Sequence, residues 1–74
     1  MRGLVDRKGE QFAYFVGNTL YTLDDEPTGR LQGKYIVDLS GNRMWLVIGD
    51  GVYTLDGAET IGFIGSERTR NITD

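Results

Sequence analysis

The chain has 74 residues, a net charge of −3, and neither cysteine nor histidine. These properties exclude a disulfide scaffold, zinc sites of the Cys/His type, a thiol nucleophile and any Ser-His-Asp arrangement. The negative net charge and the lack of a basic cluster outside the tail also disfavour nucleic-acid binding. No apolar run approaches the length of a membrane span. Such a small chain needs good packing or a partner subunit to be stable.

Short alternating apolar segments, bounded by Gly, Asn, Asp and Pro, predict eight strands and no substantial helix. In chain order they cover residues 4–6, 11–16, 19–23, 28–32, 35–39, 43–48, 52–55 and 59–64. In the second strand, Ala13 and Phe15 are expected on one face and their neighbours on the other. Pro27 is expected to exclude a central strand at its position, which leaves the fourth strand weaker and one residue shorter.

The stretch 4–24 recurs as 36–56 after a shift of 32 residues, with eight identities in 21 positions. Because each hairpin spans about half of that period, the repeat predicts four sequential hairpins in one all-β domain. The expected domain covers residues 1–66, with copies at 4–35 and 36–66, and has internal pseudo-symmetry. The hairpins would bury their apolar faces together, as a closed barrel or as petals around an axis. Residues 67–74 form a polar tail that is expected to be disordered.

Turn and strand motifs within residues 4–65 resemble the bacterial four-fold beta-flower proteins. The motifs are Phe15-Val16-Gly17-Asn18-Thr19-Leu20-Tyr21, Val47-Ile48-Gly49-Asp50-Gly51-Val52-Tyr53, Leu55-Asp56-Gly57 and Thr60-Ile61-Gly62-Phe63-Ile64. The resemblance implies four hairpins about a central axis and carries over no catalytic residue. The chain departs from the pattern in the second hairpin, where Asp25-Glu26-Pro27 replaces the expected glycine turn.

Aromatic residues are the candidate binding residues. Trp45 occupies the position of Ala13 in the other copy, a large residue opposite a small one, which favours packing near a symmetry axis over ligand stacking. Tyrosines and a tryptophan on a small sheet can form a platform for a peptide or a carbohydrate. Covering the ends of a small core is the favoured alternative role for these rings. The candidates are Trp45, Tyr21, Tyr53, Tyr14 and Tyr35.

Acidic residues offer weaker candidates. Asp24, Asp25 and Glu26 are consecutive and lack the alternating spacing of a calcium loop, so no metal site is expected. Paired carboxylates from the two copies, Asp6 with Asp38 or Asp24 with Asp56, would be needed for glycoside hydrolysis. In repeats such acids more often bond their own turn backbone.

The sequence names no ligand. The leading hypothesis is a small non-enzymatic binding or assembly module without cofactors, located in the cytoplasm. Its partners would be a second copy of the chain, most simply in a two-fold dimer, a protein or a small molecule, and neither nucleic acid nor membrane. The alternatives are a carboxylate-based hydrolase and an accessory protein that docks through a sheet edge.

Overall fold

The computed structural model describes residues 1–67, which form one all-β unit of eight short strands. None of these residues is helical. The tail that was expected to be disordered, residues 67–74, lies outside the described residues except for residue 67. The strands are β1 (Arg2–Asp6), β2 (Gln11–Val16), β3 (Thr19–Thr22), β4 (Pro27–Gln32), β5 (Tyr35–Asp38), β6 (Arg43–Ile48), β7 (Gly51–Tyr53) and β8 (Thr60–Ile64).

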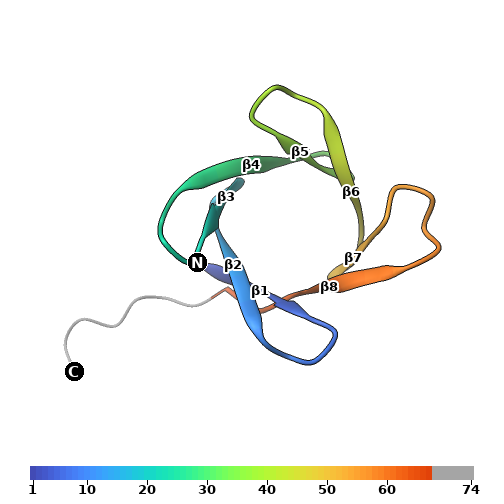
Figure 1. The fold of residues 1–74 in the computed structure, drawn as a ribbon, viewed down its shortest axis with the longest axis horizontal. Helices are drawn as coiled ribbons and strands as arrows, with labels where there is room; N and C mark the ends of the chain where they lie inside the picture. Colours follow the sequence, from blue (N-terminus) through green and yellow to red (C-terminus); the bar gives the residue numbers. More distant parts are fainter. Residues whose placement is uncertain (68–74) are drawn as a thin grey trace.

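The strands form a closed barrel in which each pairs antiparallel with its neighbours in sequence. Closure comes from β1 and β8, where Leu4 lies opposite Ile64 and Val5 opposite Phe63. Figure 1 shows the resulting ring, from which the β1–β2, β5–β6 and β7–β8 hairpins project outward. The predicted all-β fold of four consecutive hairpins is therefore confirmed, in its closed-barrel form.

The two strands of every hairpin pair with a register shift at the same place, and the extra residue lies on the even-numbered strand. The shifts follow Leu4, Leu20, Ile36 and Val52, at intervals of 16 residues. Each of these four side chains is at most 3% exposed, and together they form the inner row of the core cluster. A bulge bends its strand and increases the local twist, which lets strands this short curve into a closed ring.

A side-chain oxygen at the start of each hairpin loop organises that loop. The Asp6 and Asp38 carboxylates and the Thr22 hydroxyl each accept hydrogen bonds from the backbone N–H groups two and four residues further along. Such bonds replace the ladder where the chain reverses. The third residue beyond the acceptor has a positive φ, and in the second hairpin this residue is Asp25, with φ 67°.

The second hairpin is more regular than the sequence indicated. β4 begins at Pro27 and has six residues, as many as β2 and β6, so the predicted shortening is wrong. Pro27 is tolerated because it is the first residue of its strand, opposite Tyr21 and beside the register shift. The irregular loop is the fourth, where Thr54 N–H reaches the carbonyl of Glu59, five residues on.

The loops also begin earlier than predicted. β3, β5 and β7 end before residues 23, 39 and 55, which were expected to belong to strands. The three leucines at these positions lie in the hairpin loops and are about half exposed or more: Leu23, Leu39 and Leu55.

Of the four positions directly opposite the inner row, one holds a large side chain and three hold small residues. Opposite the four inner residues lie Ala13, Gly29, Trp45 and Gly62. The Trp45 ring meets the Phe12 ring edge-to-face at 6.4 Å and 84°, although β6 and β2 are not neighbours in the ring. Phe12 and Met44, equivalent in the two copies, both pack against the core cluster. The tryptophan thus spans the interior that the small residues leave open.

Candidate functional site

The five aromatic candidates do not form one platform. Trp45 is half-buried and packs against the core cluster, so the structure places it in the interior. The four tyrosines lie on strands at partly buried positions and divide into two groups. One group is on β2 and β3, and the other is on β5 and β7.

Tyr14 and Tyr21 form the first group, as directly opposed residues of β2 and β3. Their rings stack at 5.3 Å with an interplanar angle of 15°. The Tyr14 hydroxyl donates a hydrogen bond to the carboxylate of Asp25 in the second hairpin loop. This bond, with desolvation and the negative charge of Asp25 adding to it, raises the pKa of Tyr14 to about 12. The Tyr14 hydroxyl therefore has a hydrogen-bond partner within the protein, and its bond to Asp25 attaches the second hairpin loop to the barrel.

Tyr35 and Tyr53 form the second group, on either side of Leu46. Both lie directly opposite Leu46, Tyr35 from β5 and Tyr53 from β7, so the three share one face of the sheet. A side chain at Gly51 would collide with the Tyr53 ring, which shows that this ring lies next to Gly51 of its own strand. At Gly33, which lies two residues before Tyr35 as Gly51 lies before Tyr53, an added Cβ would meet no atom within 4 Å.

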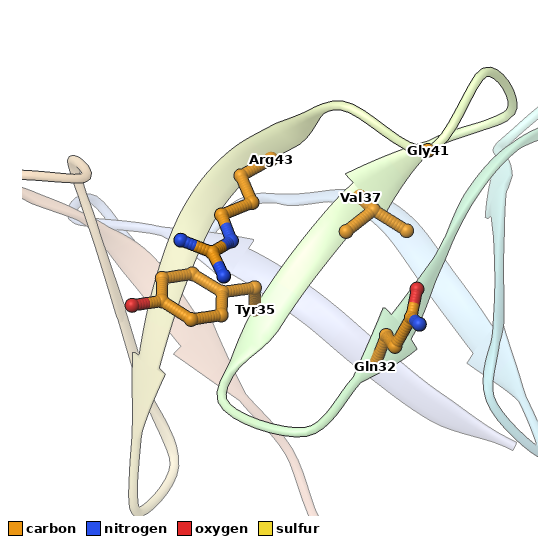
Figure 2. A pocket seen from close by; sticks show the side chains of 5 residues that line it. All are labelled: Gln32, Tyr35, Val37, Gly41 and Arg43. Atoms are coloured by element: carbon orange, nitrogen blue, oxygen red, sulfur yellow. The ribbon is translucent and has the colours of Figure 1, made fainter.

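Tyr35 instead borders a pocket of about 240 Å³ on the outside of the barrel, between β4, β5 and β6. Figure 2 shows the Arg43 guanidinium over the Tyr35 ring, with the Val37 and Gln32 side chains beside them. The guanidinium carbon lies 4.2 Å from the ring centroid, within the range of a cation–π contact. The lining residues are Gln32, Tyr35, Val37, Gly41 and Arg43.

Val37 gives this pocket an apolar lining. It is 4% exposed, yet it does not belong to the core cluster that fills the barrel. Val37 alternates with Ile36, which is fully buried inside, and therefore faces outward. It lies opposite Arg30 on one side and Arg43 on the other, so the aliphatic stems of two arginines flank it.

The lean of Arg43 toward Tyr35 follows from the hairpin geometry. In the first copy the equivalent residues are Gln11 and Gly3, and a Cβ placed on Gly3 would lie 3.1 Å from the Gln11 side chain. The residue after the loop therefore leans over the strand start in both copies. In the second copy this geometry joins a cation to an aromatic ring.

The surroundings of the pocket are basic in a chain of net charge −3. Arg30, Lys34 and Arg43 are the three cations within residues 30–43, against the single acid Asp38. The backbone N–H of Asn42, followed by the Asn42 side chain and further N–H groups, holds the pKa of Asp38 below its ordinary value. Within residues 1–67 the ion pairs are Met1 with Glu67 and Arg2 with Asp50, so none of the three cations is paired.

The acids do not converge on a common site. Asp6, Asp24, Asp38 and Asp56 lie in or at the start of four different hairpin loops. The Asp56 carboxylate accepts hydrogen bonds from the Thr54 hydroxyl and the Ala58 N–H. Over the described residues, no group of three or more acidic side chains is placed to hold a metal ion. In that same part of the chain, no helix has the length and apolar character needed to cross a membrane.

Sequence reasoning found Tyr35 but missed Arg43, Gln32, Val37 and Gly41. The signal that could have identified them is the spacing of Tyr35 and Arg43 on either side of the loop of residues 39–42, which closes the β5–β6 hairpin. Comparison of the two copies did not reveal this pair, because the equivalent residues in the first copy, Gly3 and Gln11, carry neither an aromatic ring nor a charge.

Comparison with known proteins identifies neither a family nor a function for this chain. No family model, no curated protein and no solved structure matches the chain, so the resemblance to beta-flower proteins has no confirming match.

Proposed function

We propose that this protein is a small non-enzymatic binding module whose pocket on β4–β6 takes a carboxylate-bearing peptide segment. The observation that supports this is the unpaired Arg43 guanidinium held on the Tyr35 ring at the side of a preformed pocket. A guanidinium that rests on an aromatic face still presents its N–H edge, and that edge matches a carboxylate in a bidentate manner.

The size and lining of the pocket favour one or two side chains over a whole cofactor. Its volume of about 240 Å³ is below the range of roughly 300–1,000 Å³ typical of drug-sized ligands. Val37 and the Tyr35 ring offer apolar contact, while the Gln32 amide and Arg43 offer donors. An acidic residue next to an apolar one is the segment that uses both parts.

The alternative functions find less support. Hydrolysis by paired carboxylates needs two acids about 5–10 Å apart across one cleft, whereas the acids here organise separate loops. Docking through a sheet edge needs an unpaired strand, and each of β1–β8 already has two neighbours.

We propose further that the four hairpins are related by internal pseudo-symmetry, as in the bacterial beta-flower proteins, and that the protein acts in the cytoplasm. The 16-residue spacing of the register shifts supports the first part. A circular permutant that begins at Lys34, with residue 67 joined to residue 1, should then fold and melt cooperatively. A permutant that does not fold would count against equivalence of the links.

The test of binding is fluorescence anisotropy with a labelled acidic peptide that includes an apolar residue, Gly-Leu-Asp-Asp-Glu-Gly, and its amide twin, Gly-Leu-Asn-Asn-Gln-Gly. The acidic peptide should bind and the amide twin should not. Arg43→Gln should weaken binding about tenfold or more, because a charge-assisted hydrogen bond contributes about 1.5–3 kcal/mol. Tyr35→Leu should also weaken it, since the guanidinium loses its support.

The matched control is Arg7→Gln, which removes an exposed cation from the first hairpin loop. Its affinity should equal that of the unmodified protein. Equal loss in Arg7→Gln and Arg43→Gln would show that only net charge matters, and the pocket would then have no part in binding.

A further inference from the structure

The second hairpin loop is the most acidic segment of the described chain. Asp24, Asp25 and Glu26 are exposed and consecutive, and Leu23 beside them is 56% exposed. Only Asp25 has a side-chain partner, the Tyr14 hydroxyl. The loop conformation is fixed by the Thr22 hydroxyl through backbone N–H groups, which leaves the Asp24 and Glu26 carboxylates without a cation.

The other hairpin loops differ from this one in charge or in the state of their acids. The first contains Arg7 and Lys8, and the third contains Asp38 at its start with its carboxylate bonded within the loop. In the fourth, the Asp56 carboxylate is bonded to Thr54 and Ala58. The Glu59 carboxylate of the fourth loop has no hydrogen bond within its loop either, but the acid directly after Leu55 is the bonded Asp56. Among the four hairpin loops, an exposed leucine followed directly by an unbonded carboxylate is therefore a property of residues 23–26, which we call the acidic loop.

The acidic loop complements the pocket in both chemistry and charge. The loop offers an apolar side chain and unpaired acids, and the pocket offers Val37, the Tyr35 ring and unpaired Arg43, with Arg30 and Lys34 nearby. Within one molecule the two do not meet through any ion pair. Figure 1 shows the β3–β4 loop at the left edge of the ring and the β5–β6 hairpin at its upper right.

From this complementarity we propose that the occupant of the pocket is the acidic loop of a second copy of this chain, in a two-fold dimer. Glu26 pairs with Arg43 of the other protomer, and Leu23 lies against Tyr35 and Val37. A two-fold arrangement uses both loops and both pockets, whereas a head-to-tail arrangement leaves one of each free and continues to grow. This inference rests on the proposed carboxylate site.

The test is a charge exchange between two variants, Arg43→Glu and Glu26→Lys, followed by sedimentation velocity over a concentration series up to millimolar protein. The unmodified protein should dimerise. Each variant alone should be monomeric, with the dissociation constant of the dimer raised about tenfold or more, because both of its contacts oppose like charges. An equimolar mixture of the two variants should recover the dimer, since every loop then faces a pocket of opposite charge.

Two controls separate this pairing from general charge effects. Glu10→Lys changes the acid that holds the same place in the first hairpin loop, and Arg7→Glu changes a cation distant from the pocket. Both should dimerise like the unmodified protein. Circular dichroism and thermal melting of each variant establish that loss of the dimer is not loss of the fold.

The outcomes distinguish the inference from the proposed function. A protein that binds the acidic peptide through Arg43 but sediments as a monomer at millimolar concentration keeps the binding site and overturns the dimer. A mixture of the two variants that stays monomeric overturns the pairing of loop and pocket. Species that grow beyond the dimer overturn the two-fold arrangement.

Discussion

Gly62→Ala should destabilise the barrel more than an exposed glycine substitution, because the barrel has no room for a methyl group there. Gly62 is buried on β8, opposite Val52 on one side and Asp6 on the other. A Cβ at this position would overlap the Val5 carbonyl oxygen and lie 3.0 Å from its carbonyl carbon and 3.3 Å from the Asp6 Cα. These are backbone atoms, so β1 itself has to move where it closes the ring.

The expected loss is about 2–3 kcal/mol, the upper range for overpacking a close-packed site. For a domain of this size, whose whole stability is roughly 4–11 kcal/mol, this lowers the melting temperature by about 10–20 °C. Circular dichroism melts measure it directly. The matched control is Gly65→Ala, where the Cβ lies 3.6 Å from the Gly3 carbonyl oxygen in ordinary contact, so its stability should be unchanged or slightly raised. Equal melting temperatures for the Gly62→Ala and Gly65→Ala variants would contradict the close approach of β8 to β1.

Three further predictions concern side chains whose surroundings differ. Trp45→Ala should lower stability by about 3 kcal/mol, measured by urea unfolding, because the contact with Phe12 across the barrel is lost and a cavity is left; a change near zero would place the ring outside the core. Asp25→Asn should return the pKa of Tyr14 from about 12 toward its ordinary value of 10.0. Since the raised pKa belongs to the folded state, this contribution to stability is present below pH 10.0 and lost as the pH rises through about 12, and tyrosinate absorbance, with Tyr14→Phe as reference, follows the titration. Asp38 and Asp56 have lowered pKa values, held down by the Asn42 backbone N–H and the Thr54 hydroxyl respectively. Their contributions to stability are therefore present above the ordinary value of 3.8 and lost as the pH falls through the folded-state values, and carboxyl-carbon NMR titration should show both midpoints below 3.8.

The strands could be predicted because the local pattern and the fold agree. In β2 and β6, the alternation of Ala13 and Phe15, or Trp45 and Val47, with their neighbours matches one face toward the core. The ends of β3, β5 and β7 could not be predicted in the same way. The leucines at residues 23, 39 and 55 continue the apolar alternation of these strands. The residue before each leucine, however, already forms the hydrogen bonds that hold the loop, through its backbone or its side chain.

The pocket could not be predicted because it depends on pairing across a hairpin and on a register shift. Tyr35 and Arg43 are eight residues apart and are not directly opposed, since Tyr35 faces Leu46 and Arg43 faces Val37. Their contact requires the diagonal lean of a long side chain. The packing role of Trp45 could be inferred because Ala13 occupies its position in the other copy. That Gly29 and Gly62 occupy the equivalent positions in the other two hairpins follows only from the strand pairing in the barrel.

The most direct test of the carboxylate site is the NMR signal of the Arg43 Nε–Hε group during titration with N-acetyl-aspartyl-glutamate, compared with sodium chloride at equal ionic strength. The Arg43 resonance should shift and saturate with the dipeptide and stay in place with the salt, while the Arg7 resonance moves little in either. Equal shifts at Arg43 and Arg7, or shifts that salt alone reproduces, would contradict a carboxylate site at Tyr35 and Arg43.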